Sequence, residues 1–89
     1  MKAIVTVVGK DRVGIIAGIC NELARFNVNV LDISQTVMQG YFTMMMVVDV
    51  SASTLPLGEL SVAMDTMGKE RALSIRVQRE DIFEAMHRI

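Results

Sequence analysis

The residues best able to do chemistry in this chain are those of the segment Asp11–Ile15. They lie between an apolar run at residues 3–8 and a segment with helical periodicity at residues 15–26. A turn that leads from a strand into a helix places unpaired backbone N–H groups, at the positive end of the helix dipole, beside the fixed charges of Asp11 and Arg12. This arrangement predicts a place that holds a small anionic or zwitterionic ligand.

Side chains that act elsewhere as nucleophiles or metal ligands are isolated in this sequence. Cys20 lies in the apolar stripe of the first predicted helix, so we expect a small buried residue rather than a nucleophile. His87 is the one histidine, and one histidine does not make a metal site. The sequence also has no glycine-rich nucleotide loop and no catalytic dyad. We therefore expect no metal, no cofactor and no enzyme activity.

The composition predicts one small domain that associates with itself. Of 89 residues, 52% are hydrophobic, and a chain this short leaves more apolar surface than one core can bury. The formal net charge is −1 and aromatic residues make up 4%, so we expect neither nucleic acid nor an anionic membrane as a partner. One cysteine and an N-terminal apolar run too short for a signal sequence or a membrane span predict a cytoplasmic protein.

Apolar periodicity predicts four strands and two main helices along the chain. The strands are expected at residues 2–8, 28–39, 41–50 and 73–78, and the helices at 15–26 and from Leu57 to about Gly68, with a further helix at 80–89. Thr54 is the expected N-cap of the second helix, a change of parity near Asp32 predicts a bulge, and Gly40 predicts a hairpin turn. This order predicts an α+β, ferredoxin-like βαββαβ fold, with a four-stranded antiparallel sheet, two helices on one face and a short C-terminal helix.

The turn and the strand after the first helix resemble the ACT domain family. The resemblance is carried by Lys10-Asp11-Arg12-Val13-Gly14-Ile15 and by Asn27-Val28-Asn29-Val30-Leu31-Asp32-Ile33-Ser34-Gln35. It covers a core at residues 1–79 of a single domain at 1–89. The segment 78–89 resembles short free-standing members, related to the glycine-cleavage regulator and to the N-terminal domain of formyltetrahydrofolate deformylase. The resemblance implies a non-catalytic module that binds an amino acid or similar effector and regulates a metabolic enzyme or a transcription regulator.

The resemblance also implies where the effector binds. In amino-acid-binding members, the strand–helix turn of one subunit faces the start of the second strand of a neighbour, so a homodimer or higher homo-oligomer is implied. Carried over to this sequence, one wall consists of Asp11, Arg12, Val13, Gly14 and Ile15, and the other of Asn27, Asn29 and Leu31 from a second copy. The family has Pro where this chain has Val13. Serine-binding members have His where it has Gly9, so serine is not the expected ligand.

Each of these residues also has a structural interpretation. Asp11 caps a helix in many such turns, Gly14 permits close helix–sheet packing, and an Asn at the position of Asn27 often ends a helix. A solvated side chain is a common outcome for Arg12, and a solvated face is the expected role of four further basic residues, Lys69, Arg71, Arg76 and Arg79.

Two alternative functions stay open beside the ligand-binding module. One is a protein-interaction module without a small ligand, which would act on an enzyme or regulator encoded elsewhere. The other is an acylphosphatase-like enzyme that would use Arg12 beside the helix start. Acylphosphatases share the expected architecture, but their characteristic loop sequence is absent and no base or nucleophile accompanies Arg12.

Overall fold

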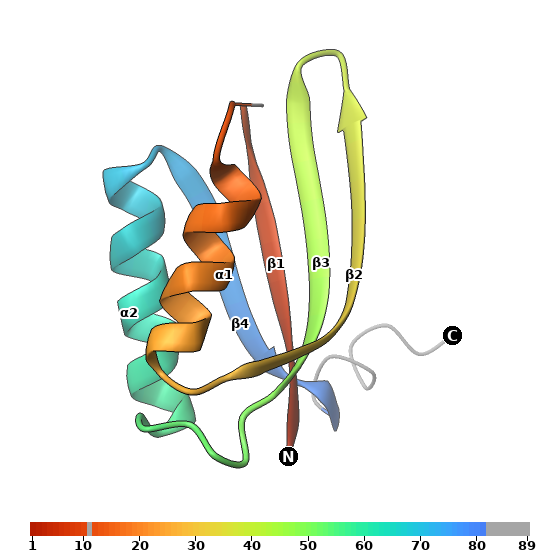
Figure 1. The fold of residues 1–89 in the computed structure, drawn as a ribbon. Helices are drawn as coiled ribbons and strands as arrows, with labels where there is room; N and C mark the ends of the chain where they lie inside the picture. Colours follow the sequence, from red (N-terminus) through yellow and green to blue (C-terminus); the bar gives the residue numbers. More distant parts are fainter. Residues whose placement is uncertain (11, 82–89) are drawn as a thin grey trace.

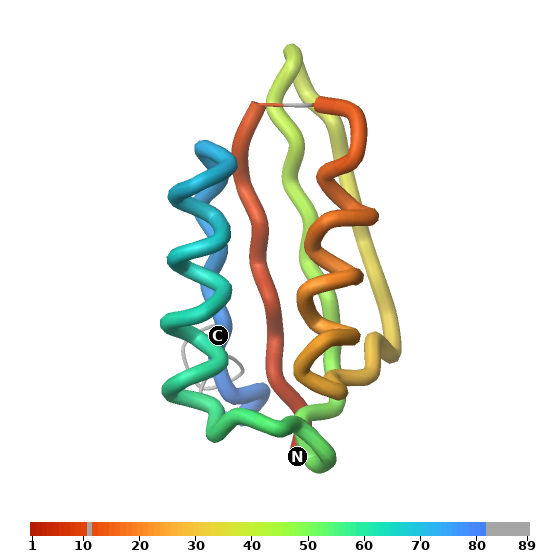
Figure 2. The backbone as a smooth tube through the Cα atoms, turned by 60° about the vertical axis from the view of Figure 1, so that its left-hand side comes forward, coloured from red at the N-terminus to blue at the C-terminus, as the bar shows by residue number. Residues whose placement is uncertain are grey.

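The computed structural model describes residues 1–10 and 12–81. Its elements are β1 (Lys2–Lys10), α1 (Ile15–Arg25), β2 (Asn29–Met38), β3 (Tyr41–Asp49), α2 (Leu57–Glu70) and β4 (Leu73–Arg79). The strands pair antiparallel in the order β2-β3-β1-β4, and both helices cover one face of this sheet (Figure 1, Figure 2). The predicted ferredoxin-like fold is therefore confirmed, while the last eight residues of the predicted C-terminal helix, 82–89, lie outside the described residues.

The hydrophobic core lies between the helices and the sheet because each element has one apolar side. In β3 every second side chain, from Phe42 to Val48, is buried, as expected for a strand with one covered face. The helices contribute residues at helical spacing: Ile15, Ile19 and Leu23 from α1, and Leu60, Met64 and Met67 from α2. Met44, Met46 and Met64 are fully buried, because their flexible side chains fill irregular spaces in the core.

Two predicted boundaries differ from the structure. The first strand continues through Gly9 to Lys10, because these residues pair with Phe42 and Tyr41 of β3. The prediction that Thr54 caps α2 was wrong. The helix begins after Pro56 without a side-chain cap, and the Thr54 hydroxyl donates to the carbonyl oxygen of Phe26 at 3.4 Å.

The predicted bulge and hairpin turn are both present. The register of β2 against β3 shifts between Val30 and Asp32, so Leu31 is the extra residue. Gln39 and Gly40 have φ values of 51° and 82°, the positive pair that a two-residue hairpin turn requires. Beyond the bulge, Ile33 and Val37 pair with residues of β3 that face the helices. These two side chains therefore lie on the helix side of the sheet.

Candidate functional site

The turn between β1 and α1 depends on the backbone of Gly14. This residue precedes the first residue of α1 and has a φ of 89°, a left-handed conformation that side-chain-bearing residues rarely adopt. A Cβ at Gly14 would meet no atom within 4 Å, so the close-packing interpretation of this glycine was wrong. No side-chain cap bond is present at the start of α1 in the described structure. Asp11 lies outside the described residues, so its role as a cap or ligand residue stays a prediction.

A cleft of about 230 Å³ opens beside this turn. Its lining consists of Arg12, Val13, Gly14 and Ile15 from the turn, together with Glu70, Arg71 and Leu73 from the junction of α2 and β4. Ile15 and Leu73 are buried and form an apolar base, whereas the three charged side chains are exposed at its rim. The structure thus brings the four described turn residues together, as predicted, and adds three residues that sequence reasoning missed.

The missed residues reach the turn through the register of the sheet. Because β4 runs antiparallel to β1, its first residue, Leu73, pairs with Gly9 at the end of β1. A Cβ at position 9 would overlap the Cδ2 atom of Leu73. The Leu73 side chain therefore fills the space that any side chain at position 9 would enter, including the histidine of serine-binding family members.

Gly18, one turn after Gly14 on α1, makes a second close approach possible. An ideal Cβ at Gly18 would lie 2.5 Å from Nη1 of Arg71. The guanidinium group of Arg71 therefore lies against the backbone of α1, although the residue as a whole is exposed, as expected from the sequence. Lys69 and Arg79 are exposed and paired with Asp65 and Asp81 at 3.2 and 2.7 Å.

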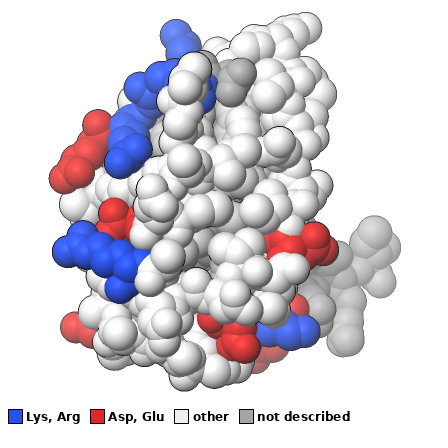
Figure 3. Space-filling model, in the orientation of Figure 1, with Lys and Arg blue, Asp and Glu red and all other residues white. Residues whose placement is uncertain are grey.

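Within the described residues, the charged side chains at the rim of the cleft form no ion pair. The described residues form four ion pairs, and none of these involves Arg12, Glu70 or Arg71. Basic side chains gather at the end of the molecule where α2 ends and α1 begins, in the upper left of Figure 3. At this end Arg12, Arg71 and Glu70 therefore lie beside an apolar base without an ion pair among the described residues.

The second wall implied by the family lies elsewhere in the subunit. Asn27 follows α1, and Asn29 and Leu31 lie at the start of β2, whereas the turn precedes α1. The eleven residues of α1 separate the two groups by about 16 Å. One chain therefore does not bring the predicted walls together, and the contribution of Asn27, Asn29 and Leu31 to a site stays a prediction.

Asn27 already has a structural role at its own end of the molecule. It has a φ of 60° and so ends α1 in a left-handed conformation, and its Nδ2 donates to the carbonyl oxygen of Ala52 at 3.0 Å. The backbone N–H of Thr54 donates to the carbonyl of Phe26 at 2.9 Å. These bonds connect the end of α1 to the loop between β3 and α2.

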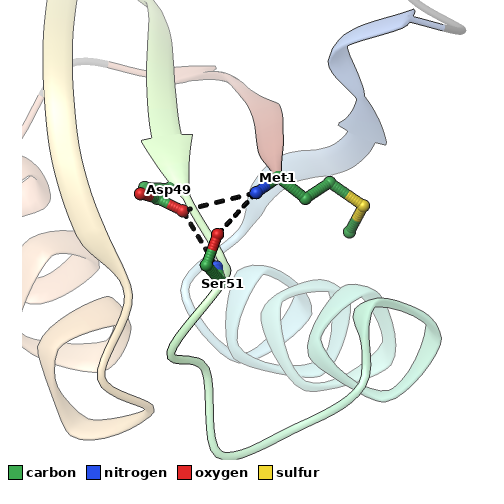
Figure 4. A network of polar contacts seen from close by, with 3 residues as sticks. All are labelled: Met1, Asp49 and Ser51. Carbon is green, nitrogen blue, oxygen red and sulfur yellow. Dashed lines mark hydrogen bonds and ion pairs between the residues drawn. The ribbon is translucent and has the colours of Figure 1, made fainter.

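A polar network closes the same end of the sheet (Figure 4). The amino group of Met1 donates to the Ser51 hydroxyl and lies 3.7 Å from the Asp49 carboxylate. The backbone N–H of Ser51 donates to Asp49 at 2.9 Å. Hydrogen bonds from the side chain and backbone of Ser51, together with the charge of the amino group, lower the pKa of Asp49 below its ordinary value.

The outer edge of β2 carries apolar side chains that remain exposed. Leu31, Ile33, Val37 and Met38 are 41–68% exposed, and Val13 in the turn is completely exposed. In Figure 3 the upper right of the surface, over the β2–β3 hairpin, shows neither basic nor acidic side chains. Part of the apolar surface predicted from composition thus lies along one edge of the sheet and at the turn.

Other kinds of site find little support in the described part of the chain. Residues 1–10 and 12–81 contain no group of three or more His, Cys, Asp or Glu side chains that could hold a metal ion. Cys20 is a free thiol that packs against the core, but it is half-buried rather than buried as predicted. His87 lies outside the described residues. Neither α1 nor α2 is long and apolar enough to cross a membrane.

Comparison with known sequences agrees with the resemblance seen in the turn. A family model described as "ACT domain" matches residues 2–78. A UPF0237 protein of Listeria innocua is 49% identical over 89 residues, which cover all of both chains. The family suggested by the turn is thus found over nearly the whole chain.

Solved structures share the fold at several levels of identity. An ACT domain protein from Streptococcus pneumoniae is 44% identical, covers 94% of each chain and has a TM-score of 0.83. A formyltetrahydrofolate deformylase from Pseudomonas syringae pv. tomato is 23% identical over 88% of this chain and 27% of its own, with a TM-score of 0.80. A putative glycine cleavage system transcriptional repressor is 18% identical over 86% of this chain and 44% of its own, with a TM-score of 0.75. At these last two identities the likeness shows a common fold.

Proposed function

Because the chain belongs to the ACT domain family, we propose that it is a regulatory module that binds an amino acid or similar small metabolite between two copies of itself. The observation that carries this proposal is the open apolar edge of β2 beside a turn with uncompensated charges. The module would be non-catalytic and would modulate a metabolic enzyme or a transcription regulator. The similarity in fold to a putative transcriptional repressor supports the regulatory role.

The edge of β2 has the properties of a pairing surface. Its ten residues include one charged side chain, that of Asp32, and no proline or lysine that would protect an open edge. Pairing of β2 with β2 of a second copy would join two four-stranded sheets into one of eight strands and cover the exposed apolar side chains. Such an isologous contact uses the same surface on both copies.

This pairing would also complete the ligand site. In Figure 1, α1 begins at the same end of the sheet as the β2–β3 hairpin, where β2 ends. Antiparallel pairing about a twofold axis places the start of the second copy's β2 at that end. Asn29 and Leu31 of the second copy would then lie near Arg12 and the exposed Val13, which supports a site made from both copies.

Regulation would follow from a difference in affinity. A ligand held between two copies favours the paired state over the separated state, and it favours whichever regulatory complex contains the paired state. The resulting coupling free energy between ligand and partner acts equally in both directions. Regulation of this kind needs binding alone, without a side chain that reacts with the ligand.

A protein-interaction module without a small ligand is the second candidate. It is favoured by Val8, Tyr41 and Met45, which are 41–57% exposed on the sheet face away from the helices. This interpretation predicts a specific protein partner, no thermal shift with metabolites, and partner binding that survives Arg12→Ala.

The proposal is tested by oligomeric mass and by ligand-dependent melting. Light scattering should give a dimer or higher oligomer, and at least one of the twenty amino acids should raise the melting temperature. Val37→Lys places a charge on the β2 edge and should give a monomer that no amino acid stabilises. Val62→Lys is the matched control, because Val62 is 66% exposed on α2, away from that edge. The proposal would be refuted by a monomeric wild-type protein whose melting temperature is raised by none of the twenty amino acids.

A further inference from the structure

We infer that the cleft between the turn and the α2–β4 junction selects an α-amino acid with an acidic side chain, and that Arg71 holds one of its two carboxylates. The inference goes beyond the proposed function, because this cleft lies between the turn and β4, whereas the proposed interface follows β2 at the opposite edge of the sheet. It adds a ligand class and a binding residue that the family resemblance does not supply.

The charge of the cleft favours an acidic ligand. Arg12 and Arg71 contribute two positive charges and Glu70 one negative charge, and no ion pair within the described chain uses any of them. A neutral amino acid offers one carboxylate and one ammonium group, so one arginine would remain without a partner. An acidic amino acid offers two carboxylates and one ammonium group, which match one to one the three charges among the described lining residues. Guanidinium groups bind carboxylates through two parallel hydrogen bonds, so each match is strong and directional.

The size of the cleft agrees with this class of ligand. Its volume of about 230 Å³ lies below the range of roughly 300–1,000 Å³ for sites that enclose drug-sized molecules. Ile15 and Leu73 form an apolar base beneath the charged rim. A small molecule with charged ends and a short aliphatic middle complements both features.

Arg71 is held in place at both ends. Its backbone N–H donates to the carbonyls of Met67 and Gly68 at 3.2 and 3.0 Å, which fixes the residue at the end of α2. Its guanidinium lies against α1 where Gly18 lacks a Cβ. An arginine placed in this way loses less conformational freedom when it binds a carboxylate than one extended into solvent.

The nearest acidic residue on α1 does not compensate Arg71. Glu22 shares with Arg71 a second groove, between the two helices, but its carboxylate pairs with Arg25 at 3.1 Å. Arg71 therefore remains available for a ligand carboxylate in the first cleft.

Titration of the ¹⁵N-labelled full chain, followed by amide chemical shifts, tests the inference. L-Aspartate or L-glutamate should shift the amides of Ile15 and of residues 70–73, which line or adjoin the cleft. Shifts of Asn29 and Leu31 report separately on the proposed interface, which follows β2 at the opposite edge of the sheet. L-Asparagine and L-glutamine have nearly the same shape without the second charge, and they should bind about tenfold more weakly or worse. Sodium sulfate at equal ionic strength controls for non-specific anion binding.

Variants separate Arg71 from general charge effects. Arg71→Ala should weaken binding of the acidic amino acid about tenfold or more. Arg76→Ala removes the same charge from the sheet face away from the helices, and it should bind like the wild type. Gly18→Ala keeps the arginine but displaces its guanidinium, so it should also weaken binding.

The outcomes distinguish this inference from the proposed function. If amides of Asn29 and Leu31 shift, but the affinity is unchanged by Arg71→Ala or by loss of the ligand's second charge, the inference is overturned and the interface site is supported. If residues 70–73 shift without Asn29 and Leu31, and binding depends on Arg71 and on the second charge, the inference is supported, and the oligomeric mass then tests the interface site. Equal shifts with sulfate overturn the inference, and so does the absence of any shift with aspartate and glutamate.

Discussion

The two ends of the sheet use similar polar residues but differ in how far these residues are paired. At the end where β3 stops, Met1, Asp49 and Ser51 bond to one another and Asn27 donates to Ala52. At the opposite end, Arg12, Glu70 and Arg71 have no ion-pair partner among the described residues, and Val13 is fully exposed. Paired polar groups contribute to folding, whereas unpaired charges beside an apolar base remain available for a ligand.

The difference also separates two asparagines that the family resemblance places on one wall. Asn27 supports the closed end of its own subunit through its backbone conformation and its side-chain hydrogen bond. Asn29 is exposed on the edge strand and has no such bond in the described structure. Of the two, Asn29 is therefore the one whose amide is available to a second copy.

The largest expected effect concerns the base of the open end. Leu73→Ala should lower the free energy of unfolding by about 2–4 kcal/mol, because it leaves a cavity under Gly9 and beside the cleft. Leu73→Met conserves volume and should cost about 1.5 kcal/mol or less. Urea denaturation measures both. If Leu73→Ala costs no more than Leu73→Met, Leu73 is not part of the core and the open end has no rigid base.

The closed end should respond to loss of its asparagine. Asn27→Ala should lower the free energy of unfolding by about 1–2 kcal/mol, because it removes the hydrogen bond to Ala52. Alanine also tolerates a φ of 60° less well than asparagine, whose polar side chain can form local hydrogen bonds in this conformation. Asn27→Gly keeps the backbone conformation and should lose less. Asn29→Ala, at an exposed position, should stay within about 0.5 kcal/mol of the wild type. Equal losses for Asn27→Ala and Asn29→Ala would contradict the structural role of Asn27.

Gly18 should show that stability and binding oppose each other at the open end. Gly18→Ala should raise the free energy of unfolding by about 0.5–1 kcal/mol, because alanine favours the helix and the added Cβ displaces only the end of a flexible side chain. The same substitution should weaken ligand binding through Arg71. A melting curve and a titration on one sample measure both effects. A variant that is more stable but binds the ligand as tightly as the wild type would contradict the role of the Arg71 position in binding.

The smallest effect concerns pH at the closed end. The pKa of Asp49 is lower in the folded chain than in the unfolded chain, so its contribution to stability is complete above the unfolded value, near pH 4, and is lost as the pH falls through the folded value. Asp49→Asn should therefore reduce the fall in urea midpoint between pH 5 and pH 3. The exposed position of Asp49 keeps this change small. An unchanged pH profile would show that the network in Figure 4 does not affect folding.

Most of the fold was predictable from the sequence because apolar periodicity directly reports which face of an element is covered. The alternation in β3 and the helical stripes of α1 and α2 appear in the structure as predicted. The start of α2 was not predictable in the same way, because Thr54 and Pro56 both precede it and both are common at helix starts. Packing of the loop onto the end of α1 decides between them, and that contact depends on residues far apart in the chain.

The candidate site was predictable only in part. A strand, a charged turn with glycine and a helix are contiguous in sequence, so residues 12–15 could be found from their order alone. Glu70, Arg71 and Leu73 come from the other end of the chain and reach the turn through the pairing of Leu73 with Gly9. The contact between Gly18 and Arg71 could not be predicted from the sequence around Gly18, because glycine also occurs within helices where no other side chain approaches it.

The bulge at Leu31 determines which way the edge strand faces. Because one residue is skipped there, Ile33 and Val37 lie on the helix side and Asp32, Ser34 and Thr36 on the other. A strand of the same length without the bulge would exchange these two sets, whereas a chain that lacks Leu31 would keep the present pairing. Deletion of one residue at this point leaves unchanged the face on which each later residue of β2 lies, whereas insertion of one residue further along β2 reverses it.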